Sequence, residues 1–113
     1  MVTNNPLVRD KRSQAEFHDT DYLGILKIVR DRIHLGHKLL SRPLSGSVKP
    51  GETPYKTVVL SAMKGSLDEK ALSIIEDSIQ TCLKLSKIGA KLNWTPEILA
   101  DFQLIDYNLV SSD

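Results

Sequence analysis

Apolar residues return every three or four positions in the first half of the chain. This stripe consists of Tyr22, Leu26, Val29 and Ile33. Such spacing places the side chains on one face of an α-helix. Asp19 or Thr20 is expected to cap the start of this helix, because a short side-chain oxygen accepts an orphan N–H of the first turn. Gly36 is expected to mark its end.

A second helix is predicted after Ser66-Leu67-Asp68-Glu69, which has the form of a capping box with Ser66 as the cap. Its apolar side is formed by Leu72, Ile75, Ile79, Cys82 and Leu83. Gly89 is expected to end this helix, since glycine readily adopts the conformation that terminates helices.

A third helix start lies at Thr95-Pro96-Glu97, which places a capping hydroxyl before proline and an acid in the first turn. The apolar positions that follow, at spacings of four, three and four, are Ile98, Phe102, Ile105 and Leu109. This spacing favours a helix. A strand over residues 103–110 remains the alternative, because Ile105, Tyr107 and Leu109 would then share one face.

Strand signals are short. Residues 57–62 form a β-branched apolar run with little alternation, which predicts a central strand covered on both faces. Residues 1–5 and 15–18 are expected to form two further short strands. Residues 9–14 are polar throughout and are expected to form a surface turn.

Helices interleaved with at least one buried strand predict the α/β class. We expect residues 1–113 to form a small single-domain sandwich with a short, mostly parallel sheet and about three helices. A crossover through the first helix to the strand near Val58 is expected to be right-handed. Hydrophobic residues make up 41% of the chain and charged residues 26%, which excludes collagen-like, disordered and disulfide-scaffold proteins.

Charge and cysteine content narrow the function classes. Fifteen basic and fourteen acidic residues leave a net charge of +1, too little to gather nucleic acid or an anionic membrane. The single cysteine, Cys82, is expected to be a buried, inert thiol, which fits a reducing compartment. No apolar run resembles a signal peptide or a membrane span. These observations predict a cytoplasmic protein without nucleic-acid or membrane partners.

The segment between the first helix and the strand at residues 57–62 is unusually long for a loop. Loops beyond about 12–15 residues are usually functional or disordered. Its candidate anion-binding residues are Ser45, Gly46, Ser47, Lys49, Thr53 and Lys56. Glycine lets backbone N–H groups converge, hydroxyls donate hydrogen bonds and lysines add positive charge. The alternative is a rigid structural loop that packs over the sheet edge or forms a dimer contact.

Two pairs of polar residues outside this loop are further candidates. His34 and His37 recur with Asp31 every three residues, but Gly36 breaks the turn between them, so no metal site is expected. Either histidine could act as a general base beside the loop hydroxyls. Asn4 and Asn5 could reach a ligand at a strand end, although a turn explains them more simply.

Four segments form a longer pattern: TNNP (residues 3–6), DRIHLGHKLL (31–40), PLSGSVKP (43–50) and ETPYK (52–56). This pattern resembles the GrdX family, small proteins encoded alongside the glycine reductase system of anaerobic amino-acid fermenters. The resemblance covers most of the chain. It implies an accessory role in a selenium-dependent reductase pathway rather than a reductase activity. Arg42 stands where the family pattern has a histidine, so no histidine-based role is expected at that position.

Two functions follow as hypotheses. The first is a non-catalytic accessory protein, in which the loop binds a small anionic ligand or a protein of the reductase pathway. The second is a small enzyme that uses His34 or His37 as a general base beside residues 45–56. The lack of an acid–base or nucleophile constellation favours the first. Whether either function uses a cofactor is unknown from the sequence. A homodimer with exchanged loops is a third alternative.

Overall fold

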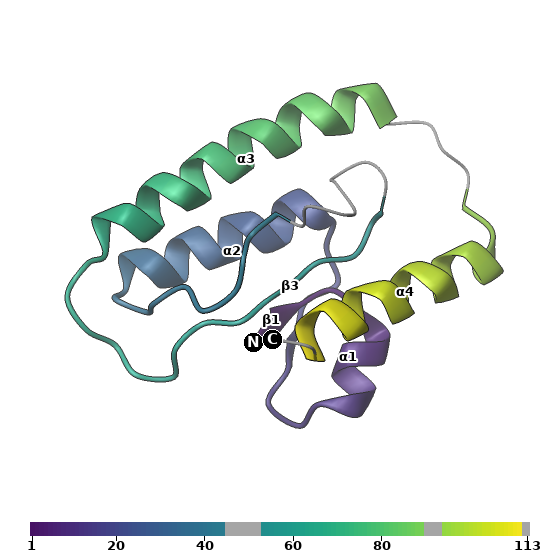
Figure 1. Cartoon of the computed structure of the whole chain (residues 1–113), viewed down its shortest axis with the longest axis horizontal. Coiled ribbons are helices and arrows are strands. Elements are labelled where there is room, and N and C mark those ends of the chain that lie inside the picture. The colour runs from purple at the N-terminus through teal and green to yellow at the C-terminus, as the bar shows by residue number, and fades with distance from the viewer. Residues whose placement is uncertain (45–52, 90–93, 112–113) are drawn as a thin grey trace.

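The computed structural model describes residues 1–44, 53–89 and 94–111, in which four helices surround three short strands (Figure 1). In chain order the elements are β1 (Val2–Thr3), α1 (Pro6–Lys11), β2 (Glu16–Phe17), α2 (Tyr22–His34), β3 (Thr57–Val58), α3 (Glu69–Gly89) and α4 (Pro96–Ser111). The α/β class predicted from the sequence is confirmed, with four helices in these residues instead of about three.

The sheet has the order β2-β1-β3, so the central strand is β1. β1 runs parallel to β2 and antiparallel to β3. The sheet is therefore mixed rather than mostly parallel, and the parallel crossover expected through α2 is wrong. Instead, α1 lies in the short connection between the two parallel strands β1 and β2.

β3 is shorter than predicted and lies at an edge of the sheet. Beyond Val58 the chain leaves β1 and pairs with the segment after α2. The amide of Leu40 donates to the carbonyl of Val59 at 2.9 Å, and the amide of Ser61 donates to the carbonyl of Lys38 at 2.8 Å. Only Thr57 and Val58 are covered on both faces, because helices lie on either side of β3. Residues 59–61 are half-buried and Ala62 is exposed, so the burial predicted for the whole run is confirmed only in β3.

The two faces of the sheet differ in polarity. In the β1–β3 register Val2 pairs with Val58 and Thr3 pairs with Thr57. Both valines belong to the hydrophobic core. Both threonines lie on the opposite face, because successive side chains of a strand alternate. The sheet thus has a valine face toward α2 and a threonine face toward α4 (Figure 1).

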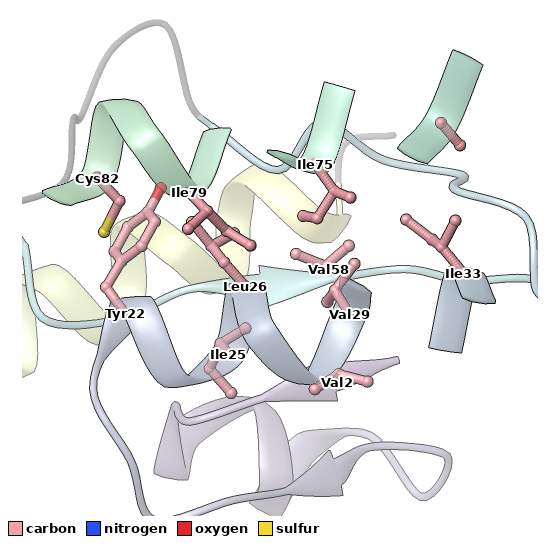
Figure 2. Close-up of a cluster of buried hydrophobic side chains, with 11 residues drawn as sticks. Val2, Tyr22, Ile25, Leu26, Val29, Ile33, Val58, Ile75, Ile79 and Cys82 are labelled. Carbon is pink, nitrogen blue, oxygen red and sulfur yellow. The ribbon is translucent and has the colours of Figure 1, made fainter. Parts of the chain in front are cut away.

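The hydrophobic core lies between α2, α3 and the valine face. α2 contributes Tyr22, Ile25, Leu26, Val29 and Ile33, and α3 contributes Ala71, Ile75, Ile79 and Cys82. Figure 2 shows Tyr22 beside Cys82 at one end of this cluster and Ile33 at the other. The predicted apolar stripe of α2 is confirmed, and most of that of α3, including the buried Cys82.

Two helix starts differ from those predicted. α2 is capped by Asp21, whose Oδ1 accepts from the amide of Gly24 at 2.7 Å, rather than by Asp19 or Thr20. At α3 the cap is Asp68, whose Oδ1 accepts from the amides of the second and third following residues, each at 3.1 Å. The capping box based on Ser66 is therefore wrong: an aspartate directly before the helix supplies the acceptor.

α4 begins as predicted, since Thr95 Oγ1 accepts from the amide of Ile98 at 3.2 Å. It continues to Ser111, which rules out a strand over residues 103–110. The surface turn predicted for residues 9–14 is wrong in part, because α1 extends to Lys11. Asn5 caps this short helix and Pro6 occupies its first turn, which together favour helix at this position.

Candidate functional site

Asn4 joins three segments of the chain through one side chain. Its Nδ2 donates to the carbonyls of Thr20 at 2.9 Å and Pro54 at 2.8 Å. Its Oδ1 accepts from the amide of Lys56 at 2.8 Å. Both amide hydrogens of the side chain and its oxygen are thus used within the fold, and they fix residues 53–56 beside the start of α2.

Asn5 forms a second junction, next to the first. Its Oδ1 accepts from the amide of Leu7 at 3.0 Å and caps α1. Its Nδ2 donates to the carbonyl of Gln103 and to Asp106 Oδ2, each at 2.9 Å. Asn5 therefore holds α4 against the end of β1.

Asp106 is buried and accepts hydrogen bonds from β3 as well. Its Oδ2 accepts from the hydroxyl of Thr57 at 2.6 Å, and its Oδ1 accepts from the amide of Thr57 at 3.2 Å. Because the single hydroxyl hydrogen of Thr57 goes to Asp106, the hydroxyl of Thr3, 2.7 Å away, donates to Thr57 Oγ1. Thr3 Oγ1 in turn accepts from the amide of Asn5 at 2.9 Å. These four residues, Thr3, Asn5, Thr57 and Asp106, form a closed network that we call the polar network.

A hollow of about 250 Å³, counting the part open to solvent, lies beside the polar network. Its lining residues are Tyr22, Thr53, Tyr55, Lys56, Phe102, Ile105, Asp106 and Leu109. One wall is apolar and comes from α4. The lining also includes Thr53, Tyr55 and Lys56, whose segment the Asn4 junction holds in place through backbone hydrogen bonds.

Lys56 is the least expected of these lining residues. It lines the hollow although only 7% of the residue is exposed. Lysine is rarely so deeply buried, because removing an ammonium group from water is costly. Thr53, also buried, lines the same hollow, and its hydroxyl accepts from the amide of Tyr55 at 3.2 Å. The lining therefore includes a lysine and a threonine that are both largely withdrawn from water.

The residues singled out in the sequence fall into three groups. Thr53 and Lys56 line the hollow, and Asn4 and Asn5 support it from the junctions described above. His34 and His37 lie at the other end of α2, about 18 Å from Tyr22 at 1.5 Å per residue. Ser45, Gly46, Ser47 and Lys49 lie outside the described residues.

The two histidines have surroundings of their own. His34 is exposed at the last position of α2. His37 Nδ1 lies 2.8 Å from the carbonyl oxygen of Ser61. Neither residue lines the hollow, so the structure does not bring them together with Thr53 and Lys56.

Sequence reasoning missed Asp106 and the part that α4 plays in the hollow. The helical stripe with Phe102, Ile105 and Leu109 was predicted, but the sequence did not indicate that Ile105 and Leu109 are exposed or that all three line a hollow. The available signal was Asp106 itself, a carboxylate between the apolar Ile105 and Tyr107. A charged residue in such a position indicates a buried polar partner, because a buried carboxylate needs donors.

A separate ion pair links β2 to α2. Glu16 accepts two hydrogen bonds from Arg32, at 2.8 Å and 2.6 Å, and His18 Nε2 lies 2.5 Å from the same carboxylate. The hydrogen bonds from Arg32 lower the pKa of Glu16 from 4.5 to about 2; partial burial opposes this, and His18 and the charge of Arg32 add to the lowering. The pair lies away from the lining of the hollow.

Metal-binding groups and membrane-spanning helices were also considered for the residues that the structure describes. Within residues 1–44, 53–89 and 94–111, no three or more His, Cys, Asp or Glu side chains are grouped so that they could hold a metal ion. No helix in the same ranges combines the length and apolar character needed to cross a membrane.

The fold and the site define a small α/β protein in which a buried lysine faces an apolar helix across a hollow. The chain belongs to the GrdX-like protein family, whose model matches residues 1–113. This match confirms the resemblance carried by the four sequence segments. Comparisons with curated proteins and with solved structures gave no match.

Proposed function

We propose that this protein is a non-catalytic accessory protein that binds a small organic anion in the hollow beside Lys56. The observation that carries this proposal is the burial of Lys56, 7% exposed, at the lining of an open hollow. A positive charge partly removed from water attracts an anion more strongly than one in bulk solvent. The hydroxyl of Thr53 supplies a hydrogen bond to the same ligand.

Asp106 also lines the hollow, so a bound anion lies near its carboxylate. This carboxylate accepts three hydrogen bonds from Asn5 and Thr57. These donors stabilise its negative charge within the fold and hold its oxygens in the polar network.

The family to which the chain belongs supports a role for this protein in the pathway of amino-acid reduction. The GrdX resemblance implies an accessory role beside the glycine reductase system, and the chain belongs to the GrdX-like family. A binding protein needs no acid–base pair at the site. No histidine lines the hollow. We therefore do not propose the enzyme that uses His34 or His37 as a general base.

The proposal is tested by titrating the ¹⁵N-labelled protein with phosphate, acetate and benzoate while recording amide chemical shifts. We expect at least one anion to shift amides of residues 53–57 and 102–109 in a saturable manner. Lys56→Met should weaken that binding about tenfold or more, because it removes the charge and keeps the apolar stem. Lys64→Met, a change at an exposed lysine, is the matched control and should bind as the native protein does.

The proposal fails if none of the three anions binds saturably. It also fails if Lys56→Met and Lys64→Met bind equally well. A native mass spectrum of each variant, recorded after gentle purification, gives an independent readout through any small molecule that the native protein retains.

A further inference from the structure

The large hydrophobic side chains that the described residues leave exposed gather mainly in two regions. One group lies on α4 and consists of Ile98, Leu104, Ile105 and Leu109. The other lies in the segments that follow α2 and precede α3, and consists of Leu35, Leu40, Met63 and Leu67. Apolar groups that are gathered on a surface and rimmed by polar residues are typical of protein–protein contacts.

The second group belongs to residues 35–40 and 61–67, which we call the loop end. Its two segments are held together, because the amide of Gly65 donates to the carbonyl of Gly36 at 2.9 Å. Met63 is 82% exposed and is the most exposed large hydrophobic residue of the described ranges. The loop end is therefore an apolar surface built from two connected segments at one end of the molecule.

The loop end is positively charged. It contains Lys38 and Lys64, both exposed, and it has no aspartate or glutamate. Of the two acids that follow it, Asp68 caps α3 and Glu69 is exposed beside the exposed Lys70. Lysine charges thus surround the exposed leucines and the methionine without an equal number of free carboxylates.

The exposed face of α4 has the opposite charge. Asp101 lies at its centre, because positions three or four residues away are its neighbours on a helix. Those neighbours include Glu97, Ile98, Leu104 and Ile105, which are all exposed. α4 has no lysine, arginine or histidine. We call this surface, which combines apolar side chains with two carboxylates, the acidic face.

The two surfaces do not cover each other within one molecule. Figure 1 shows the loop end at the left of the view and α4 at the right. Two loop ends in contact would bring lysines together, whereas a loop end against an acidic face brings opposite charges together. The net charge of +1 leaves little repulsion between whole copies.

From this complementarity we infer that copies of this chain associate head to tail, with the loop end of one copy on the acidic face of the next. The lysines meet Asp101 and Glu97, and the exposed leucines and methionine cover Ile98 and Leu104. Such a heterologous contact builds a ring where its rotation closes and an open chain where it does not. Both surfaces are small, so we expect a dissociation constant of about 10 µM to 1 mM. The inference is independent of the proposed function.

The test measures mass by sedimentation equilibrium across about 20 µM to 1 mM protein. The native protein should exceed the mass of one chain as its concentration rises. Met63→Asp disables the loop end and Leu104→Asp disables the acidic face, so each variant alone should associate about tenfold or more weakly. Ile74→Asp is the matched control: it changes an exposed hydrophobic residue of α3 outside both surfaces, and it should associate as the native protein does.

Mixing the two disabled variants distinguishes a head-to-tail contact from a symmetric one. Met63→Asp retains the acidic face and Leu104→Asp retains the loop end, so the mixture should form one-to-one pairs that grow no further. The inference is overturned if the native protein keeps the mass of one chain at every concentration. It is also overturned if the mixture associates no better than its components, or if either variant alone associates as the native protein does.

A charge exchange gives a second test that leaves the hydrophobic side chains in place. Lys64→Asp and Asp101→Lys, both changes at exposed residues, should each weaken association about threefold or more. The double variant pairs the exchanged charges across the contact and should associate more tightly than either single variant. A double variant as weak as the two separate losses combined would overturn the pairing of these surfaces, even if one of the aspartate variants above does not fold.

Discussion

Short polar side chains connect segments that lie far apart in this sequence. Asn5 binds Asp106 although 101 positions separate them, and Asn4 binds Lys56 across 52 positions. A buried polar group without a partner is costly, so each of these bonds specifies one arrangement of the chain. Single residues here determine the relative positions of whole elements.

The first prediction concerns Asp106, which is the only residue of α4 in the polar network and accepts hydrogen bonds from Asn5 and Thr57. Asp106→Asn places amide hydrogens where Thr57 and Asn5 already donate. We expect this change to lower the free energy of unfolding by about 2–3 kcal/mol, because donors are left facing donors in a buried site. Urea denaturation monitored by circular dichroism measures it.

Asp101→Asn on the same helix is the control, since Asp101 is exposed. It should change the free energy of unfolding by no more than about 0.5 kcal/mol. Equal effects of the two substitutions would show that the polar network adds nothing to stability.

Among the elements, α2 and α4 show what periodicity predicts and what it leaves open. Both helices were predicted from apolar spacing, and for α2 the spacing also identified the buried face. For α4 the same kind of stripe is only partly covered, with Ile98, Ile105 and Leu109 each about 40% exposed, and Asp106 and Gln103 bind the rest of the fold. Spacing identifies a helix, whereas the buried face depends on partners elsewhere in the chain, here Asn5 and Thr57.

In the sheet and the candidate site, too, some features follow from local sequence and others depend on contacts between distant residues. Residues 15–18 and 57–62 were recognised as strands, but the central position of β1 depends on pairing across more than 50 residues, which no local pattern contains. Local chemistry predicted Thr53 and Lys56 as ligand-binding candidates, and both line the hollow. The apolar part of that lining comes from α4, and only the tertiary structure brings it there.

A second prediction concerns the turn that ends α2. Gly36 has φ of 104°, and a side chain there would overlap the backbone of Gly65. The amide of Gly65 also donates to the carbonyl of Gly36 at 2.9 Å, so the two segments cannot easily separate. Gly36→Ala should therefore lower the free energy of unfolding by about 2–3 kcal/mol.

The matched control for that turn is Gly65→Ala, because a Cβ at Gly65 has open space around it. Its effect on the free energy of unfolding should stay within about 1 kcal/mol. Thermal denaturation of both variants compares them directly, and a Gly65→Ala variant as unstable as Gly36→Ala would contradict the steric explanation.

For the molecule as a whole, stability also depends on polar contacts that connect helices and strands outside the hydrophobic core. α4 is connected to β3 and β1 through the polar network, and Arg12 adds a cation–π contact with Tyr107 at 5.7 Å between the α1 end and α4. β2 is connected to α2 through the Glu16–Arg32 pair. Of these contacts, the Glu16–Arg32 pair depends on pH, unlike the apolar contacts of α2 and α3.

The third prediction follows from the lowered pKa of Glu16. A carboxyl with a folded-state pKa of about 2 and an ordinary value of 4.5 stabilises the fold above pH 4.5, and this contribution is lost as the pH falls toward 2. Because both side chains remain about a third exposed, water screens the pair and we expect about 1 kcal/mol. Glu16→Gln should be less stable than the native protein by this amount at neutral pH, and the difference should vanish near pH 2.

Urea denaturation of both proteins from pH 7 to pH 2 checks this dependence. In an Arg32→Met background the pH-dependent difference produced by Glu16→Gln should shrink to the smaller part that His18 contributes. A constant difference between the native protein and Glu16→Gln at all pH values would show that the ion pair is not its source.

The polar network also has a consequence for folding during synthesis. Asn5 is made 101 residues before Asp106. At about 5–20 residues per second, the interval between them is about 5–20 s. Throughout that time the side-chain amide of Asn5 lacks its partners on α4, and the hydroxyl of Thr57 lacks them from its own synthesis, 49 residues before Asp106. The attachment of α4, and with it the wall of the hollow, must therefore wait until every other element described here has been made.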